Sequence, residues 1–133
     1  MSYRIQRRPD ANQTPIIEAL LRHGISVIDL ADSGKGVADI VTFYRERVVF
    51  IELKCGKRAE LKKTQVRFLG AWPGYSGIAT TEEAAIALAK DPINNGLTDS
   101  QKVKLTKYHA TMTAKAVHLP TILKVIAETG GVG

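Results

Sequence analysis

Apolar positions along the chain alternate between helical and strand spacing. An apolar stripe predicts a helix over residues 12–23, which Gly24 ends. The stripe consists of Ile16, Ile17, Leu20 and Leu21. Further helices are predicted over 61–72, over 82–90, where Thr80-Thr-Glu-Glu83 has the spacing of a capping box, and over 120–129.

Runs rich in β-branched and other apolar residues predict four strands, over 25–31, 38–43, 48–54 and 76–80. Residues 44–47 separate the second and third strands, which indicates a hairpin with a short loop. Because both faces of these two strands are largely apolar, we expect the hairpin to be covered on both sides.

The predicted order is α-β-β-β-α-β-α, a mixed sheet flanked by helices, followed by an appendage. The breaker cluster at 91–96 divides the chain into a core of residues 1–90 and an appendage of residues 91–133. Within the appendage, 99–117 is expected to be helical, with a strand at 103–105 as the alternative. One face of the last helix either packs on the core, which we favour, or forms a dimer contact. That face carries Leu119, Ile122, Leu123 and Ile126.

Composition limits the class of protein. With 133 residues, 44% hydrophobic and 24% charged, the chain is expected to fold as a globular protein. No apolar run approaches the length of a membrane span, so we expect no membrane partner, and no secretory signal is evident. The single cysteine, Cys55, excludes an internal disulfide and a multi-cysteine zinc site, which favours a reducing, cytoplasmic location.

The charge is basic and locally concentrated. There are 19 Lys and Arg against 13 Asp and Glu, a net charge of +6. Residues 53–68 hold six basic side chains and one acidic side chain, Glu60. The basic ones are Lys54, Lys57, Arg58, Lys62, Lys63 and Arg67. Such clustering indicates a polyanionic partner, and the alternative is a solvated helix face.

Candidate chemistry lies at the end of the third predicted strand, in Glu52-Leu53-Lys54. A hairpin centred between Arg45 and Glu46 pairs Asp39 with Glu52, so both carboxylates and Lys54 share a face. Paired carboxylates repel unless a cation lies between them, and oxygen ligands suit Mg²⁺ or Mn²⁺. The alternative is a set of polar strand ends at the sheet rim, and a slip of one residue would separate the carboxylates.

Two glutamines lie on apolar helix stripes, Gln13 in the first helix and Gln65 in the helix that follows the Glu-x-Lys strand. Each is expected to face inward, where an amide needs a partner. They either orient water around a metal ion or are satisfied core amides. The three histidines are far apart and lack the spacing of metal ligands.

Taken together, these motifs resemble the PD-(D/E)xK nuclease superfamily. Within it, Gly36-Val-Ala-Asp39-Ile-Val and Phe50-Ile-Glu52-Leu-Lys54, followed by Gln65, resemble the VRR-NUC and Holliday-junction-resolvase-like branch. Asp10-Ala-Asn-Gln13 is similar to phage-encoded members. The resemblance covers about residues 10–90 and implies a restriction-endonuclease-like αβββαβ core.

The resemblance implies Mg²⁺- or Mn²⁺-dependent hydrolysis of DNA by a structure-selective endonuclease of junction-resolvase type. A homodimer in a bacterial or phage-infected cell would suit a junction substrate. Asp39, Glu52 and the backbone carbonyl of Leu53 would hold the metal ion. Lys54 would orient or deprotonate the attacking water or stabilise the developing charge, and Gln65 and Gln13 would position that water or the metal shell. The DNA-binding residues implied are Lys35, Lys57, Arg58, Lys62, Lys63 and Arg67, beside the glycines at 34 and 36.

Two other classes remain open. A non-catalytic nucleic-acid-binding module would keep the basic surface without cleaving DNA. A regulatory or assembly protein would use its C-terminal segment to bind a protein partner.

Overall fold

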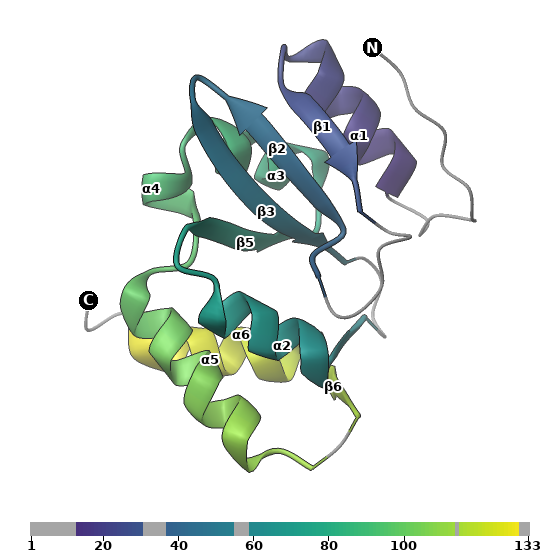
Figure 1. The fold of residues 1–133 in the computed structure, drawn as a ribbon. Coiled ribbons are helices and arrows are strands. Elements are labelled where there is room, and N and C mark those ends of the chain that lie inside the picture. Colours follow the sequence, from purple (N-terminus) through teal and green to yellow (C-terminus); the bar gives the residue numbers. More distant parts are fainter. Residues whose placement is uncertain (1–12, 31–36, 55–58, 114, 131–133) are drawn as a thin grey trace.

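The computed structural model describes residues 13–30, 37–54, 59–113 and 115–130 (Figure 1). Residues 1–12, the glycine-containing segment at 32–36 and Cys55 therefore lie outside the described residues. In chain order the elements are α1 (Gln13–Arg22), β1 (Ser26–Asp29), β2 (Ile40–Tyr44), β3 (Arg47–Leu53), β4 (Glu60–Lys62), α2 (Lys63–Ala71), β5 (Tyr75–Ala79), α3 (Glu82–Lys90), α4 (Pro92–Asn95), α5 (Asp99–Thr111), β6 (Ala116–His118) and α6 (Leu119–Gly130).

The predicted mixed sheet flanked by helices is confirmed. Its strand order is β1-β2-β3-β5, with antiparallel pairing between β1, β2 and β3 and parallel pairing between β3 and β5. One face of the sheet packs against α1 and α3 and forms the first core (Figure 1). The large side chains of this core come from α1, from alternate positions of β2 and β3, and from α3.

The helices of this core begin and end close to their predicted residues. Gly24, with a φ of 75°, follows α1 as expected. The predicted stripe of α1 is wrong at Leu21, which is exposed, whereas Ala19 is buried, because the helix packs on an arc centred nearer Ile16 and Leu20. The N-cap of α3 is Thr81, which accepts a hydrogen bond from the Ala84 N–H, rather than Thr80. Within the described parts of the chain, no helix is long and apolar enough to cross a membrane.

The β2–β3 hairpin has the predicted register. Val41 pairs with Phe50 and Phe43 pairs with Val48. Arg45 and Glu46 form the two-residue loop and both have positive φ, 50° and 68°, as a type I′ turn requires.

The expectation of cover on both sides of the hairpin is wrong. Phe43 is 51% exposed and Val48 is 44% exposed. Both lie on the face opposite to α1 and α3. On that face, α2 reaches Phe50 through ring contacts from Phe68 and Trp72, and the pair at the turn end of the hairpin stays uncovered.

A second core joins α2 to the C-terminal elements. Its buried side chains are Leu61, Val66, Leu69, Leu105, Val117, Leu119 and Ile122. The prediction that Leu61 lies in a helix is wrong, because residues 60–62 form β4 and Leu61 pairs with Val117 of β6. Residues 103–105 belong to α5, which excludes the alternative of a strand there. Residues 116 and 117, predicted as the end of that helix, belong instead to β6.

Most of the apolar face of α6 packs inward, as we favoured. Leu119 and Ile122 are buried and Ile126 packs against them, whereas Leu123 is exposed. The division of the chain after residue 90 stays a prediction. The packing nevertheless ties residues on both sides of it together, because α2 packs directly on α5.

Leu105→Ala tests the importance of the second core. Leu105 is fully buried, so this substitution should lower the free energy of unfolding by about 2–5 kcal/mol. Val103→Ala, on the exposed side of the same helix, should change it by less than about 0.5 kcal/mol. Urea denaturation followed by circular dichroism measures both values. Equal effects of the two substitutions would contradict this packing.

Candidate active site

The hairpin places Asp39 and Glu52 beside each other, where β3 ends. Extending the observed register by one pair beyond Ile40 and Ile51 sets Asp39 opposite Glu52. The Oδ2 atom of Asp39 accepts a hydrogen bond of 2.9 Å from the Leu53 N–H. This bond fixes the carboxylate of Asp39 against the last residue of β3.

Glu52 is the buried centre of the site. Its side chain is fully enclosed, and its Oε2 atom lies 3.2 Å from the Lys54 Nζ atom. The same oxygen accepts a hydrogen bond of 2.9 Å from the Nε2 atom of Gln65. The second oxygen, Oε1, is buried and has no hydrogen-bond partner among the described residues. A buried carboxylate oxygen without a donor is costly unless another group binds it.

Gln65 connects this carboxylate to the start of α2. Its Oε1 atom accepts a hydrogen bond of 2.7 Å from the Lys62 N–H, as the third residue of a capping box does. With the amide oxygen held in this way, the amide NH₂ group points to Glu52. Gln65 thus lies beside the carboxylates, and its two bonds also fit the alternative of a satisfied amide.

The environment of Glu52 favours its protonated form. Burial raises the pKa of Glu52 well above its ordinary value of 4.5, and the neighbouring charge of Asp39 raises the pKa further. Lys54 acts in the opposite direction and lowers the pKa of Glu52. The repulsion that the sequence predicted between the two carboxylates is therefore present, and Lys54 compensates only part of it.

A cation could relieve the remaining repulsion. Within the described residues there is no group of three His, Cys, Asp or Glu side chains that could hold a metal ion. Two carboxylates and a backbone carbonyl would be a small ligand set. Mg²⁺ accepts such a set, because it keeps several of its own waters and binds proteins through one or two carboxylates.

The other predicted site residues are not all brought to this cluster. Gln13 is the first residue of α1, but its side chain lies outside what the structure describes. Of the predicted DNA-binding residues, Lys62 and Arg67 are exposed and Lys63 is half-buried. Lys35, Lys57 and Arg58 lie outside the described residues, as do the glycines at 34 and 36.

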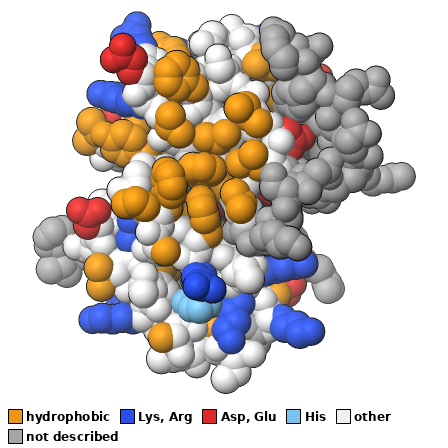
Figure 2. All heavy atoms as spheres, viewed as in Figure 1, with side chains coloured by type: hydrophobic (Ala, Val, Ile, Leu, Met, Phe, Trp, Pro, Cys, Tyr) orange, Lys and Arg blue, Asp and Glu red, His pale blue; other side chains and the backbone are white. Residues whose placement is uncertain are grey.

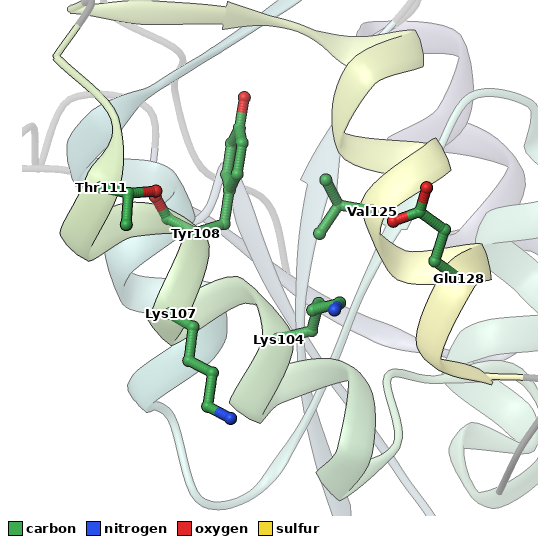
Figure 3. A pocket seen from close by; sticks show the side chains of 6 residues that line it. All are labelled: Lys104, Lys107, Tyr108, Thr111, Val125 and Glu128. Atoms are coloured by element: carbon green, nitrogen blue, oxygen red, sulfur yellow. The ribbon is translucent and has the colours of Figure 1, made fainter.

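The sequence pattern did not point to a further set of basic side chains, which lie on the surface of the segments that form the second core. They are Lys104, Lys107, Lys115 and Lys124, all at least partly exposed. The signal available was the spacing of three lysines within residues 102–107 of α5. Lys104 and Lys107 line a pocket of about 290 Å³ between α5 and α6, together with Tyr108 and Glu128 (Figure 3). This pocket contains no residue of the carboxylate cluster.

No protein-family model, no curated protein and no solved structure matches this chain. The chemistry of the site therefore has to be argued from its own residues.

Glu52→Gln should change how stability depends on pH, in the presence of EDTA. Because the pKa of Glu52 is raised in the folded state, folding takes up a proton at pH values above 4.5. The contribution of Glu52 to the free energy of unfolding is therefore largest below pH 4.5. Stability is then lost as the pH rises through the raised pKa. Glu52→Gln should abolish this loss and be more stable than wild type at neutral pH. Urea denaturation from pH 4.5 to pH 8 measures the effect.

Glu60→Gln is the matched control for this experiment. Glu60-Leu61-Lys62 repeats the Glu-x-Lys pattern, but its carboxylate is exposed, so removing it should keep the pH dependence of the wild type. A wild-type stability that rises across the same range would show that the environment of Glu52 does not favour its protonated form.

Proposed function

We propose that this chain is a metal-dependent nuclease that hydrolyses phosphodiester bonds in DNA on a restriction-endonuclease-like core. The observation that carries the proposal is the buried carboxylate of Glu52. It lies beside Asp39 and Lys54, with one oxygen lacking a hydrogen-bond partner among the described residues. Burying this carboxylate beside a second one costs stability, and such a perturbed carboxylate pair is typical of sites that bind a charged ligand.

The donor set fits Mg²⁺ or Mn²⁺. Asp39 and Glu52 supply hard oxygen ligands on one face of the hairpin. The N–H and C=O of a strand residue point to the same side, and the Leu53 N–H points to Asp39, so the Leu53 carbonyl would complete the set. When bound, the metal ion would lower the pKa of a coordinated water and stabilise charge on the phosphate.

The remaining residues would position the attacking water and stabilise charge. Water adds to phosphorus and gives up a proton to the solvent, one phosphorus–oxygen ester bond breaks, and the departing oxygen takes up a proton from the solvent. The Lys54 ammonium, held 3.2 Å from Glu52, would orient the attacking water or stabilise the added negative charge. Gln65 would keep the Glu52 carboxylate in position through its amide, since its own oxygen is bound to the start of α2.

A non-catalytic nucleic-acid-binding module remains the alternative. Two carboxylates that face a phosphate would repel it, which makes Asp39 and Glu52 unfavourable in a protein that only binds DNA. A branched substrate, a homodimer and a cytoplasmic location stay expectations from the family resemblance.

Cleavage assays test the catalytic assignment. Wild type should cut labelled DNA in Mg²⁺ or Mn²⁺, and Asp39→Asn and Lys54→Ala should each lower the rate by about 100-fold or more. Glu60→Gln should cut at the wild-type rate, because its carboxylate is exposed and outside the cluster. The panel of substrates contains duplex, single-stranded, flap and four-way-junction DNA. Cleavage that is indifferent to both site substitutions, or no cleavage of any substrate, would refute the assignment.

Metal binding can be measured without any DNA. A ligand that binds only the folded state raises the melting temperature, so 10 mM Mg²⁺ should stabilise wild type relative to EDTA. Asp39→Asn and Glu52→Gln should lose most of this shift, and Glu60→Gln should keep it. An equal shift in all four proteins would place the metal ion elsewhere.

A further inference from the structure

The uncovered apolar side chains lie on the same face of the sheet as the carboxylate cluster, and along β3 the two are separated by Phe50, which α2 covers. Along β2, Phe43, Val41 and Asp39 lie on one face, and along β3 the same face carries Val48, Phe50 and Glu52. From Phe43 to Asp39 is four residues, about 13 Å. This is the length of about four stacked bases of a DNA strand.

The surface of this face is apolar and exposed. Ile28 of β1 pairs with Val41 and is 61% exposed. Phe43, two positions further along β2 on the same face, pairs with the exposed Val48 of β3. Figure 2 shows a broad apolar area in the part of the molecule where Figure 1, in the same view, places the sheet. Exposed apolar areas of this kind mark interaction sites.

A basic helical layer borders the apolar face. Residues 59–71 and 97–130 hold eight Lys and Arg against three Asp and Glu. The sheet layer, here residues 13–30, 37–54 and 72–96, holds five Lys and Arg against eight Asp and Glu. Figure 2 shows Lys and Arg side chains below the apolar area, over the helices of the second core, and others at the upper left edge of the molecule. The two surfaces meet directly, because Phe68 of α2 contacts Phe50 of the sheet, with 5.2 Å between their ring centroids. Arg67 and Phe68 line the same pocket, of about 250 Å³.

We propose that the open sheet face binds an unpaired DNA strand and guides it to the Asp39–Glu52 cluster. Bases lie on the apolar face formed by Ile28, Phe43 and Val48. Phosphates contact Arg67 and the lysines of the basic helical layer that borders this face. Apolar and aromatic surface beside basic side chains is the combination that binds single strands, because bases stack on it and phosphates are neutralised next to it. A continuous duplex hides its bases and would leave this face in contact with water.

A second copy of this chain is the other possible occupant, and charge disfavours it. In a symmetric dimer whose two-fold axis runs from the sheet towards the helical layer, the same patch meets itself and the basic borders of the two copies face each other. Like charges that are brought together in this way weaken an interface.

Binding assays in EDTA test the proposal independently of cleavage. A fluorescent oligo(dT) strand should bind more tightly than a duplex of equal length. Phe43→Ala should weaken binding of the strand by about 5- to 100-fold, the scale of one lost base–aromatic stack. Leu21→Ala, an exposed apolar side chain on α1 behind the sheet, should not change it.

Salt titrations test the phosphate contact. Arg67→Ala should lower the slope of log affinity against log salt by about 0.7, the effect of one lost phosphate contact on a single strand. Arg22→Ala, an exposed arginine on α1, should leave the slope unchanged. Sedimentation of Phe43→Asp measures the oligomeric state in parallel.

The outcomes separate this inference from the proposed function, on which it rests. Binding of the strand that depends on Phe43 and Arg67 supports it, whether or not cleavage is seen. A protein that cleaves DNA with metal, but binds duplex as tightly as single strand and is unaffected by Phe43→Ala, overturns this inference. That result leaves the proposed nuclease activity standing. A dimer that Phe43→Asp converts to a monomer, with binding of the strand unchanged, overturns it in favour of a second copy. An RNA strand that binds more tightly than DNA would also overturn it.

Discussion

The register of the β2–β3 hairpin decides where every side chain of the candidate site lies. Side chains alternate between the faces of a strand, so a slip of one residue would move Glu52 to the face covered by α1 and α3. The two-residue turn at Arg45 and Glu46 fixes the register at one end of the hairpin. The hydrogen bond from the Leu53 N–H to Asp39 secures it at the other end.

The burial of Glu52 follows from that register and carries a cost. Its carboxylate lies next to Asp39 and away from water, and Lys54 with Gln65 compensates one of its two oxygens. The site is therefore less stable than an apolar strand end would be. Strain of this kind is typical of sites that bind a charged ligand, because the ligand supplies the missing interaction.

The two halves of the molecule carry different kinds of side chain. The sheet layer supplies the carboxylates and an apolar face, and the segments that form the second core hold eight of the thirteen Lys and Arg in the described residues. α2 joins them, since Phe68 and Trp72 contact Phe50 while Leu69 packs in the second core, near α5. Residues 97–130 thus belong to the surface that borders the site.

The sequence by itself determined the features that depend on near neighbours. The hairpin register, the pairing of Asp39 with Glu52 and the extent of α3 follow from alternation, turn chemistry and capping, which act over a few residues. It did not predict β4, since Leu61 forms a strand only because Val117 pairs with it from 56 positions further along the chain. Nor could it show that Phe43 and Val48 stay exposed, because apolar residues in a strand predict burial and only the placement of α2 decides how far the cover extends. Contacts between distant segments are set by the packing of the whole chain, which no local pattern encodes.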